Sequence, residues 1–433
     1  MPDSSTSRPV AGSLVAVLAL LTAVAPLATD MYLPAFPDMA RDLGSSASGI
    51  QLTLTAFLVG LGLGQLMIGP LSDSIGRRRP LVVGSLVCLV ASAACALAPT
   101  IEVLGAARFT QGLSGAAGVV LARAIIADTA RGTAAAKLLG VVMVISVIAP
   151  VIAPLSGGAI IASFDWRAVF WVQGALTVVM LAGVLAFVPE SLPEQTRTRG
   201  GFRATVAGAR TALANRSYVG YLLTFCFAFA ALFAYISASP FVIQNVMGMS
   251  TGTYTIVFGV NALVITGTSA VAAALAGRAD YRKMIMAGLA VGVLTSIGLL
   301  LAALNGMPTV ASLVLFACFQ GSLGFIFSNA TTLALAETDR NAGTGSAFLG
   351  FLQFTLAAVV SPLVGLAGEE SAVPMGVAMT VAILLAAIAF AVLPRRTADS
   401  PATQPASRNT GPSLQTSGDS SGPSSGPVAH PWQ

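Results

Sequence analysis

Charged residues are scarce in this sequence: they make up 9% of its 433 residues, whereas hydrophobic residues make up 55%. A soluble globular domain carries about 25% charged residues on its surface. This scarcity, with a mean hydropathy of +0.85, excludes a soluble globular protein and predicts an all-α polytopic membrane protein. The net charge of +5 does not indicate nucleic-acid binding, because the charges lie in short loops between apolar runs.

Cysteine and histidine are also too few and too scattered for a metal centre. The four cysteines lie singly inside apolar segments, where buried small side chains are expected; they are Cys88, Cys95, Cys226 and Cys318. The single histidine, His430, lies in a tail rich in Ser, Pro and Gly. The sequence contains no nucleophile–base pair and no nucleotide-binding loop. We therefore predict that the protein is not an enzyme and uses no cofactor.

Long apolar runs are what the sequence has instead. Each has roughly the 17–25 residues that a helix needs to span a bilayer, and a helix satisfies its own backbone polar groups in lipid. The predicted spans are 10–33, 48–71, 80–98, 102–124, 134–161, 167–188, 217–241, 253–276, 283–304, 308–332, 343–366 and 373–393. Twelve spans separated by one long linker predict two six-helix bundles.

The domain organisation follows from these spans. We predict a cytoplasmic N-terminus over 1–9, a first bundle over 10–188, a cytoplasmic linker over 189–216, a second bundle over 217–393 and a disordered tail over 394–433. Within the linker, apolar residues at helical spacing around 202–213 are compatible with a short helix on the membrane surface or with a solvated segment.

Loop charges predict the orientation. With the loop after the second span inside, 18 of the 22 basic residues lie on the cytoplasmic side. Only Arg41 and Arg167 fall outside, while Arg108 and Arg123 lie within the fourth span. This asymmetry predicts a multi-pass protein of the cytoplasmic membrane with both termini inside.

The most conspicuous loop is the charged hairpin between the second and third spans, GQLMIGPLSDSIGRRRPL over 64–81. It places Gly69, Asp73, Gly76, Arg77 and Arg78 in a tight polar turn. A second hairpin over 277–283, with a related but degraded pattern, follows the eighth span, which is what two repeated halves produce.

Two of the ionisable residues within spans of the first bundle, Asp30 and Arg108, are candidates for function. Asp30, followed closely by Tyr32, stands near the end of the first span, and burial there would favour a protonated acid, as a proton carrier requires. Arg108 lies about 9 Å into the fourth span, at 1.5 Å per residue, so the two side chains are expected to approach each other. The alternatives are that Asp30 sits at the outer interface and that Arg108 snorkels to the outer surface.

Other residues of the spans indicate close packing or a binding cavity. Pro150, Pro154, Gly157 and Gly158 in the fifth span predict a kinked helix at a helix contact. A neutral-polar and aromatic cavity, suited to bulky and largely apolar ligands, is predicted from five residues: Tyr32, Gln111, Tyr235, Asn261 and Asn329.

Taken together, these stretches resemble the bicyclomycin- and chloramphenicol-resistance branch (Bcr/CflA) of the drug–proton antiporters in the major facilitator superfamily. The resemblance rests on motifs at 29–34, 69–80, 108–112, 149–158, 165–171, 239–242 and 258–262 and covers residues 12–393. Two positions depart from the pattern. Ser74 replaces a basic residue of the hairpin motif, and Ala153 replaces a glycine of the antiporter motif.

The resemblance implies proton-driven efflux of small, largely apolar compounds such as antibiotics by alternating access. It assigns proton coupling to Asp30 and Arg108. We expect Asp73 to face the start of the eleventh span near 341–345, with Arg77, Arg78 and Asp128 completing a cytoplasmic gate. The expected partners are a small-molecule substrate, protons and the lipid bilayer, with no nucleic acid, and each chain is expected to function as a monomer. A metabolite or sugar exporter, an importer and a membrane receptor remain alternatives.

Overall fold

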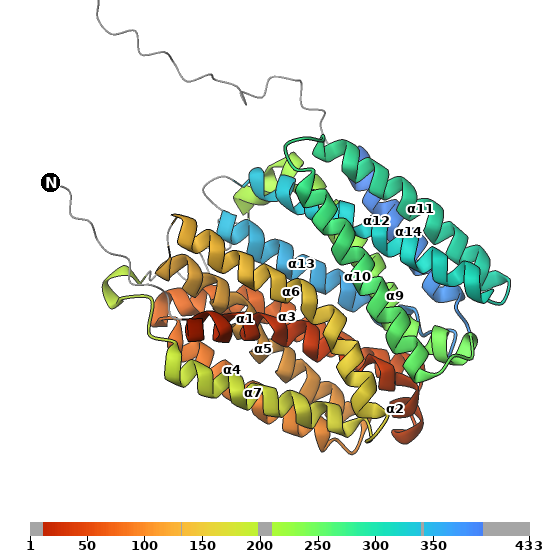
Figure 1. Cartoon of the computed structure of the whole chain (residues 1–433), viewed down its shortest axis with the longest axis horizontal. Helices are drawn as coiled ribbons and strands as arrows, with labels where there is room; N and C mark the ends of the chain where they lie inside the picture. Colours follow the sequence, from red (N-terminus) through yellow and green to blue (C-terminus); the bar gives the residue numbers. More distant parts are fainter. Residues whose placement is uncertain (1–11, 131, 198–209, 339–341, 393–433) are drawn as a thin grey trace, which may run out of the picture. The chain divides into compact units, whose positions relative to one another are not determined.

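A computed structural model describes residues 12–130, 132–197, 210–338 and 342–392, without the side chains of 132–137, 139, 143, 146, 147 and 342–344. The described residues form helices and turns and contain no β-strand. The helices of the N-terminal half are α1 (Gly12–Asp30), η1 (Leu33–Ala35), α2 (Phe36–Asp42), α3 (Ala47–Ile75), α4 (Arg78–Ala96), α5 (Ile101–Thr129), α6 (Gly132–Ile161), α7 (Arg167–Phe187) and η2 (Glu194–Thr196). Those of the C-terminal half are α9 (Arg216–Phe241), η3 (Val242–Val246), α10 (Thr251–Ala274), α11 (Tyr281–Leu304), α12 (Thr309–Ala336), α13 (Ala342–Leu363) and α14 (Val373–Ala391) (Figure 1).

The number of membrane-length helices agrees with the prediction. Within the described residues, eleven helical segments are long and apolar enough to cross a membrane, with Gly12–Asp42 counted as one. The 30-residue helix α6, between α5 and α7, is the twelfth long helix. The part of the chain that the structure describes thus contains twelve long helices, as an all-helical membrane protein requires.

Helix starts follow local capping chemistry. Ser46, Thr100 and Ser250 each precede a long helix, and each accepts a hydrogen bond from a backbone N–H of the first turn. Most bounds lie within about three residues of the predicted spans. The prediction missed α2, since a seven-residue helix directly after a span has no hydropathy signal of its own.

The two halves repeat one packing pattern. In the N-terminal half α1 packs against α5, α6 and α7, and α3 packs against α5. In the C-terminal half α9 packs against α12, α13 and α14, and α10 packs against α12. The correspondence of α1 with α9, and of each later helix with its counterpart, supports two related six-helix bundles.

Glycines allow α3 and α5 to cross at close range. A Cβ atom at Gly60 would meet the Phe109 carbonyl oxygen of α5, and one at Gly112 would meet the Phe57 carbonyl oxygen of α3. Because lipid gives little hydrophobic drive for association between helices, such close backbone contact supplies much of the packing energy.

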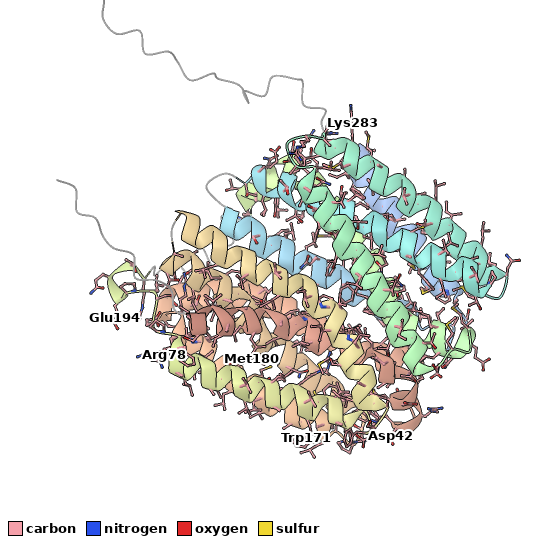
Figure 2. All side chains as sticks on the ribbon, in the orientation of Figure 1. Asp42, Arg78, Trp171, Met180, Glu194 and Lys283 are labelled. Atoms are coloured by element: carbon pink, nitrogen blue, oxygen red, sulfur yellow. The ribbon has the colours of Figure 1, made fainter. Side chains whose placement is uncertain are left out.

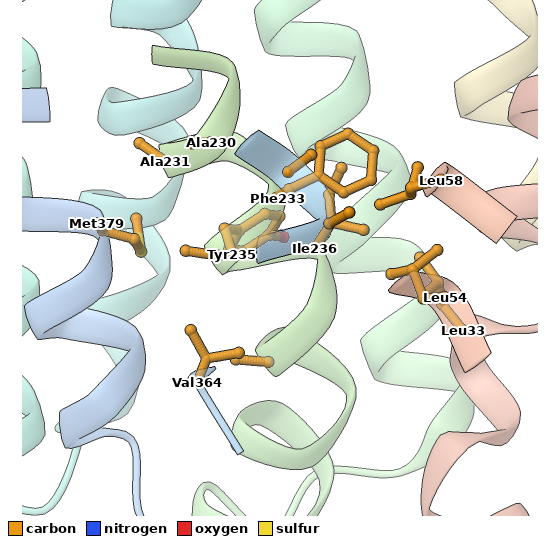
Figure 3. Close-up of a cluster of buried hydrophobic side chains, with 14 of the residues drawn as sticks. Leu33, Leu54, Leu58, Ala230, Ala231, Phe233, Tyr235, Ile236, Val364 and Met379 are labelled. Atoms are coloured by element: carbon orange, nitrogen blue, oxygen red, sulfur yellow. The ribbon is translucent and has the colours of Figure 1, made fainter. Parts of the chain in front are cut away.

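The halves meet along a seam near the start of α3. Three side chains of one α3 face donate to backbone carbonyls of the C-terminal half: Ser48 to Pro362 (3.3 Å), Gln51 to Ser237 (3.1 Å) and Thr55 to Ala358 (3.1 Å). We call these three hydrogen bonds the α3 seam. Apolar contacts continue it, and Figure 3 shows Leu54 and Leu58 of α3 facing the α9 residues Phe233 and Ile236.

Candidate functional site

Arg77 is the centre of the polar hairpin between α3 and α4. Its Nη1 lies 2.5 Å from Asp73 Oδ1 and 2.6 Å from Ser72 Oγ, and its Nε lies 3.0 Å from Asp128 Oδ2 at the foot of α5. The structure therefore brings together three of the residues predicted for the gate, Asp73, Arg77 and Asp128. We call this end of the helices the hairpin end, and the opposite end, which contains Asp42, the Asp42 end.

A fourth charged residue, Glu190, joins the hairpin from the segment after α7. Its carboxylate accepts hydrogen bonds from the backbone N–H groups of Arg77 (2.8 Å), Arg78 (3.2 Å) and Leu192 (3.1 Å). The carboxylate thus lies at the N-terminus of α4, where the helix dipole favours an anion. Sequence analysis missed Glu190, because its distance of 113 residues from Arg77 gives no local signal.

The conformation of Gly76 explains why this position is a glycine. Its φ of +96° lies in the region that favours glycine, and an added Cβ would meet the Glu190 carboxylate and the Arg197 guanidinium. The turn and the carboxylate above it therefore fit only without a side chain at position 76.

Two gate predictions have different outcomes. Arg78, labelled in Figure 2, does not join the Asp73–Arg77–Asp128 cluster; its Nη2 donates to the Leu185 carbonyl oxygen instead (2.9 Å). In the expected partner segment of Asp73 at 341–345, residue 341 and the side chains of 342–344 lie outside the described residues, so that contact stays a prediction. Gly69 faces Val120 of α5, and a Cβ added at Gly69 would lie 4.0 Å from Val120 Cγ1.

The second hairpin keeps the turn of the first but replaces its charges. Gly277 has a φ of +78°, comparable to that of Gly76. Asp280 caps α11 by accepting from the backbone N–H of Arg282 (2.8 Å), and the Arg282 side chain donates to the Tyr221 hydroxyl (3.1 Å). The repeat is thus structural, with a neutral tyrosine where the first hairpin has carboxylates.

Arg108 is fully buried within the N-terminal half. Its Nη1 donates to Gln111 Oε1 (2.6 Å) and its Nη2 to the Ala28 carbonyl oxygen (2.9 Å). Its guanidinium lies 4.3 Å from the ring centres of both Tyr32 and Phe57. Cation–π contacts and these acceptors compensate the buried charge, so the alternative of a snorkelling arginine is wrong.

Gln111 extends this site into a buried polar network. Its Nε2 donates to Ser92 Oγ (2.8 Å) and to Gln173 Oε1 (3.1 Å), and Gln173 Nε2 donates to the Leu27 carbonyl oxygen (3.4 Å). Beside it lies a cavity of about 20 Å³, which Gln111, Gln173 and Thr177 line together with apolar side chains. The cavity has room for about one water molecule.

Asp30 ends α1 and is 5% exposed, and the seven residues after it are buried as well. Asp30 is therefore enclosed by protein rather than facing water. Among the described residues it makes no ion pair, so the expected pair with Arg108 is wrong for this conformation. Arg108 binds the carbonyl of Ala28, and two residues further on the α1 chain has turned by about 200°. Asp30 instead lies within electrostatic range of Tyr254 in α10 of the other half.

The antiporter-motif residues pack α6 against two neighbours. A Cβ atom at Gly157 would meet the Met31 backbone, and one at Gly158 would lie 2.9 Å from Thr255 Cγ2 in α10. The glycines thus confirm the predicted close contacts. Both Pro150 and Pro154 lie inside α6, which stays helical through them.

Comparison with known proteins identifies the family. The model of the Major Facilitator Superfamily matches residues 18–362. The chain belongs to the major facilitator superfamily. It is 36% identical to the uncharacterized MFS-type transporter YdgK of Bacillus subtilis (strain 168), over 87% of this chain and 94% of that one.

Other relatives agree with the resemblance seen in the sequence. A bicyclomycin resistance protein homolog of Haemophilus influenzae is 28% identical over 89% of this chain and 97% of its own. The crystal structure of a D-xylose–proton symporter has a TM-score of 0.67 at 16% identity and covers 86% of this chain and 96% of that one, which shows the shared fold. These findings identify a superfamily transporter, not an enzyme.

The five residues predicted to line a substrate cavity of this transporter are buried in the present conformation, each at 2% exposure or less. Tyr32 packs beside Arg108, and Gln111 lies in the polar network. Tyr235 accepts from Asn261 Nδ2 (2.7 Å), and Asn329 donates to the Phe325 carbonyl oxygen of its own helix (2.7 Å). Their role in substrate binding stays a prediction.

A cluster of aromatic rings, which sequence analysis did not single out, lies between α9, α12 and α13. Phe229 lies at its centre. The distances from its ring centre to the other ring centres are 5.9 Å for Phe225, 4.9 Å for Phe233, 5.9 Å for Phe327 and 5.5 Å for Phe354. We call these five residues the phenylalanine cluster. Phe229, Phe327 and Phe354 are partly exposed. The spacing of Phe225, Phe229 and Phe233, four residues apart on one helix face, was the available sequence signal.

Proposed function

We propose that this superfamily transporter exports small, largely apolar compounds such as antibiotics across the cytoplasmic membrane in exchange for protons. The two halves alternate between a state closed at the Asp42 end and a state closed at the hairpin end. The hairpin end is cytoplasmic in this proposal, in keeping with the distribution of basic residues, and both termini are cytoplasmic.

The buried Asp30 is the observation on which this proposal rests. An acid within a membrane helix is costly unless it serves a purpose, and this one has no basic partner among the described residues. It lies near Tyr254 of the other half, where the halves must separate during transport. Protonation of Asp30 removes a buried charge from this contact. Its proton occupancy is thereby coupled to the opening of the Asp42 end.

The proposal predicts that Asp30→Asn abolishes proton-driven export. Asparagine preserves the shape of the side chain but cannot exchange a proton. The measurement is uptake of an apolar drug such as chloramphenicol into inside-out vesicles on imposing a pH gradient. We expect the pH-driven uptake to fall at least tenfold in Asp30→Asn. A protonophore should lower the uptake by the unaltered protein to the same extent.

Asp38→Asn is the matched control. Asp38 follows in α2, is partly exposed and pairs with Arg41 at the Asp42 end. We expect this variant to keep near-normal transport. Full pH-driven uptake by Asp30→Asn would refute the assignment of Asp30.

The phenylalanine cluster supports a largely apolar substrate. Partly exposed rings give broad apolar contacts, and edge-to-face pairs such as Phe229–Phe354 suit flat aromatic ligands. A sugar or polar-metabolite exporter would need more hydrogen-bonding groups at this position. Resistance profiling of an efflux-deficient bacterium that expresses the chain, with and without a protonophore, separates these two functions.

A further inference from the structure

Helix α5 carries two arginines with opposite surroundings. Arg108 is fully buried and its guanidinium has two hydrogen-bond acceptors and two aromatic faces. Arg123 is exposed, and no described residue forms a hydrogen bond, ion pair or ring contact with it. The proton-coupling and gate assignments leave Arg123 without a role.

The position of Arg123 explains why it has no partner. It lies six residues before the end of α5 at Thr129, about 9 Å along the axis. Asp128, five residues later, is turned away by about 140° and already pairs with Arg77. Asp73, the nearest acid at the end of α3, also pairs with Arg77. Among the described residues, Asp73 and Asp128 are thus both committed to Arg77.

The face of α5 that carries Arg123 is directed toward α3. Val120 and Ala116, three and seven residues before Arg123, face α3: a Cβ added at Gly69 would lie 4.0 Å from Val120 Cγ1, and one added at Gly64 would lie 2.6 Å from Ala116 Cβ. At 100° per residue, Arg123 lies within about 60° of both. Its side chain therefore emerges beside the last turns of α3, inside the hairpin end of the bundle.

An unpaired cation inside a membrane helix is costly, and such residues mark the paths of ions or charged substrates. Because no described residue supplies an anion to Arg123, we turn to a ligand as its source. We propose that Arg123 binds the anionic group of a substrate at the hairpin-end entrance. The exported compounds then include anions with an apolar, aromatic body. This inference rests on the proposed export function and narrows its substrate class.

The test compares two probes that share an aromatic body and differ in charge, 1-pyrenesulfonate and 1-pyrenemethanol. Binding of each is measured by fluorescence titration of the purified protein in phosphatidylcholine nanodiscs. We expect Arg123→Gln to weaken pyrenesulfonate binding about tenfold, the size of a lost charge-assisted hydrogen bond, and to leave pyrenemethanol binding within twofold. Arg123→Lys keeps the charge and is expected to retain most of the affinity.

Arg216→Gln is the matched control, since Arg216 is an exposed arginine at the start of α9 with no described partner. It should change neither affinity. Equal weakening of both probes by Arg123→Gln would show a structural role and overturn the inference. An unchanged affinity for pyrenesulfonate would overturn it as well.

Two further outcomes separate this inference from its alternatives. If Arg123→Gln affects binding only in nanodiscs that contain phosphatidylglycerol, Arg123 binds a lipid phosphate and the substrate assignment is wrong. Uptake of both probes into inside-out vesicles under a pH gradient separates the anion inference from the proposed export. If the unaltered protein exports pyrenemethanol but not pyrenesulfonate, export stands and the anion inference fails. If it exports neither, the proposed export of aromatic compounds fails first.

Discussion

At the scale of single residues, Glu190 is the least expected part of the hairpin. It places a carboxylate on the first N–H groups of α4, over a glycine that no other residue replaces without strain. Partial burial acts to raise the pKa of Glu190. The backbone N–H groups of Arg77, Leu192 and Arg78, together with the charge of Arg197, outweigh it and hold that pKa below its ordinary value.

A pH dependence follows from the lowered pKa of Glu190. The pKa of Glu190 in the folded protein lies below its unfolded value of about 4.3. At pH values between these two pKa values the unfolded chain binds more protons than the folded protein, so stability rises with pH in that range. The contribution is complete above the unfolded pKa and is lost as pH falls through the folded pKa. We expect Glu190→Gln to lower Tm by about 2 °C at pH 7, and this gap to close below pH 4.

Thermal unfolding in detergent between pH 3.5 and pH 8 measures this difference. Glu194→Gln is the control, since Glu194 is 81% exposed and lies 3.5 Å from Arg197. Its Tm should match that of the unaltered protein at every pH. A Tm difference for Glu190→Gln that persists unchanged at pH 3.5 would contradict the role of the carboxylate charge.

Candidate functional residues were predictable from the sequence where burying a charged side chain costs much free energy. Asp30 and Arg108 stand out because a charge inside an apolar run needs a reason. The sequence did not predict their contact partners, because the Ala28 carbonyl and the rings of Tyr32 and Phe57 reach Arg108 only through tertiary packing. An assumed attraction of opposite charges therefore gave the wrong neighbour for Asp30.

At the scale of helices, the twelve spans were predictable because the length of an apolar run reports directly on the thickness of the bilayer. Helix contacts were predictable only where glycine marks them, as at Gly157 and Gly158 in α6. The phenylalanine cluster and the short helix α2 depend on which faces the tertiary structure brings together. Composition alone does not specify those faces.

Gly158 gives a prediction at this scale. A Cβ at this position would lie 2.9 Å from Thr255 Cγ2 and 3.1 Å from Thr255 Cβ, across the contact between α6 and α10. The larger Gly158→Val side chain should push these helices apart and shift the population toward a state open at the Asp42 end. Spin labels at positions 164 and 370, both exposed at this end, should then show a longer mean distance.

The control for this prediction is Gly140→Val in the same helix, because a Cβ at Gly140 meets nothing within 4 Å. Its label distances should match those of the unaltered protein. If Gly158→Val also leaves them unchanged, the α6–α10 contact does not limit opening of the Asp42 end.

At the scale of the whole molecule, the conformation is closed along the α3 seam. Ser48, Gln51 and Thr55 form single hydrogen bonds to carbonyl oxygens of the other half, and the Gln51 Oε1 atom has no hydrogen-bond partner. A buried interface with an unsatisfied acceptor is less stable than a fully paired one. Its partial pairing suits an interface that opens in each cycle, a property of the assembled halves that no sequence motif encodes.

The last prediction tests this directly by locking the seam. Helices α3 and α13 pack together, and Thr55 donates to the Ala358 carbonyl (3.1 Å), so positions 55 and 358 are neighbours across the seam. The double variant Thr55→Cys/Ala358→Cys, made with Cys318→Ser to remove the exposed native thiol, should cross-link on oxidation. Transport should fall by at least tenfold and recover on reduction, because alternating access needs this seam to part. Thr55→Cys alone should stay active under oxidation. Normal transport by the cross-linked protein would show that the seam stays closed throughout the cycle and that substrate leaves by another route.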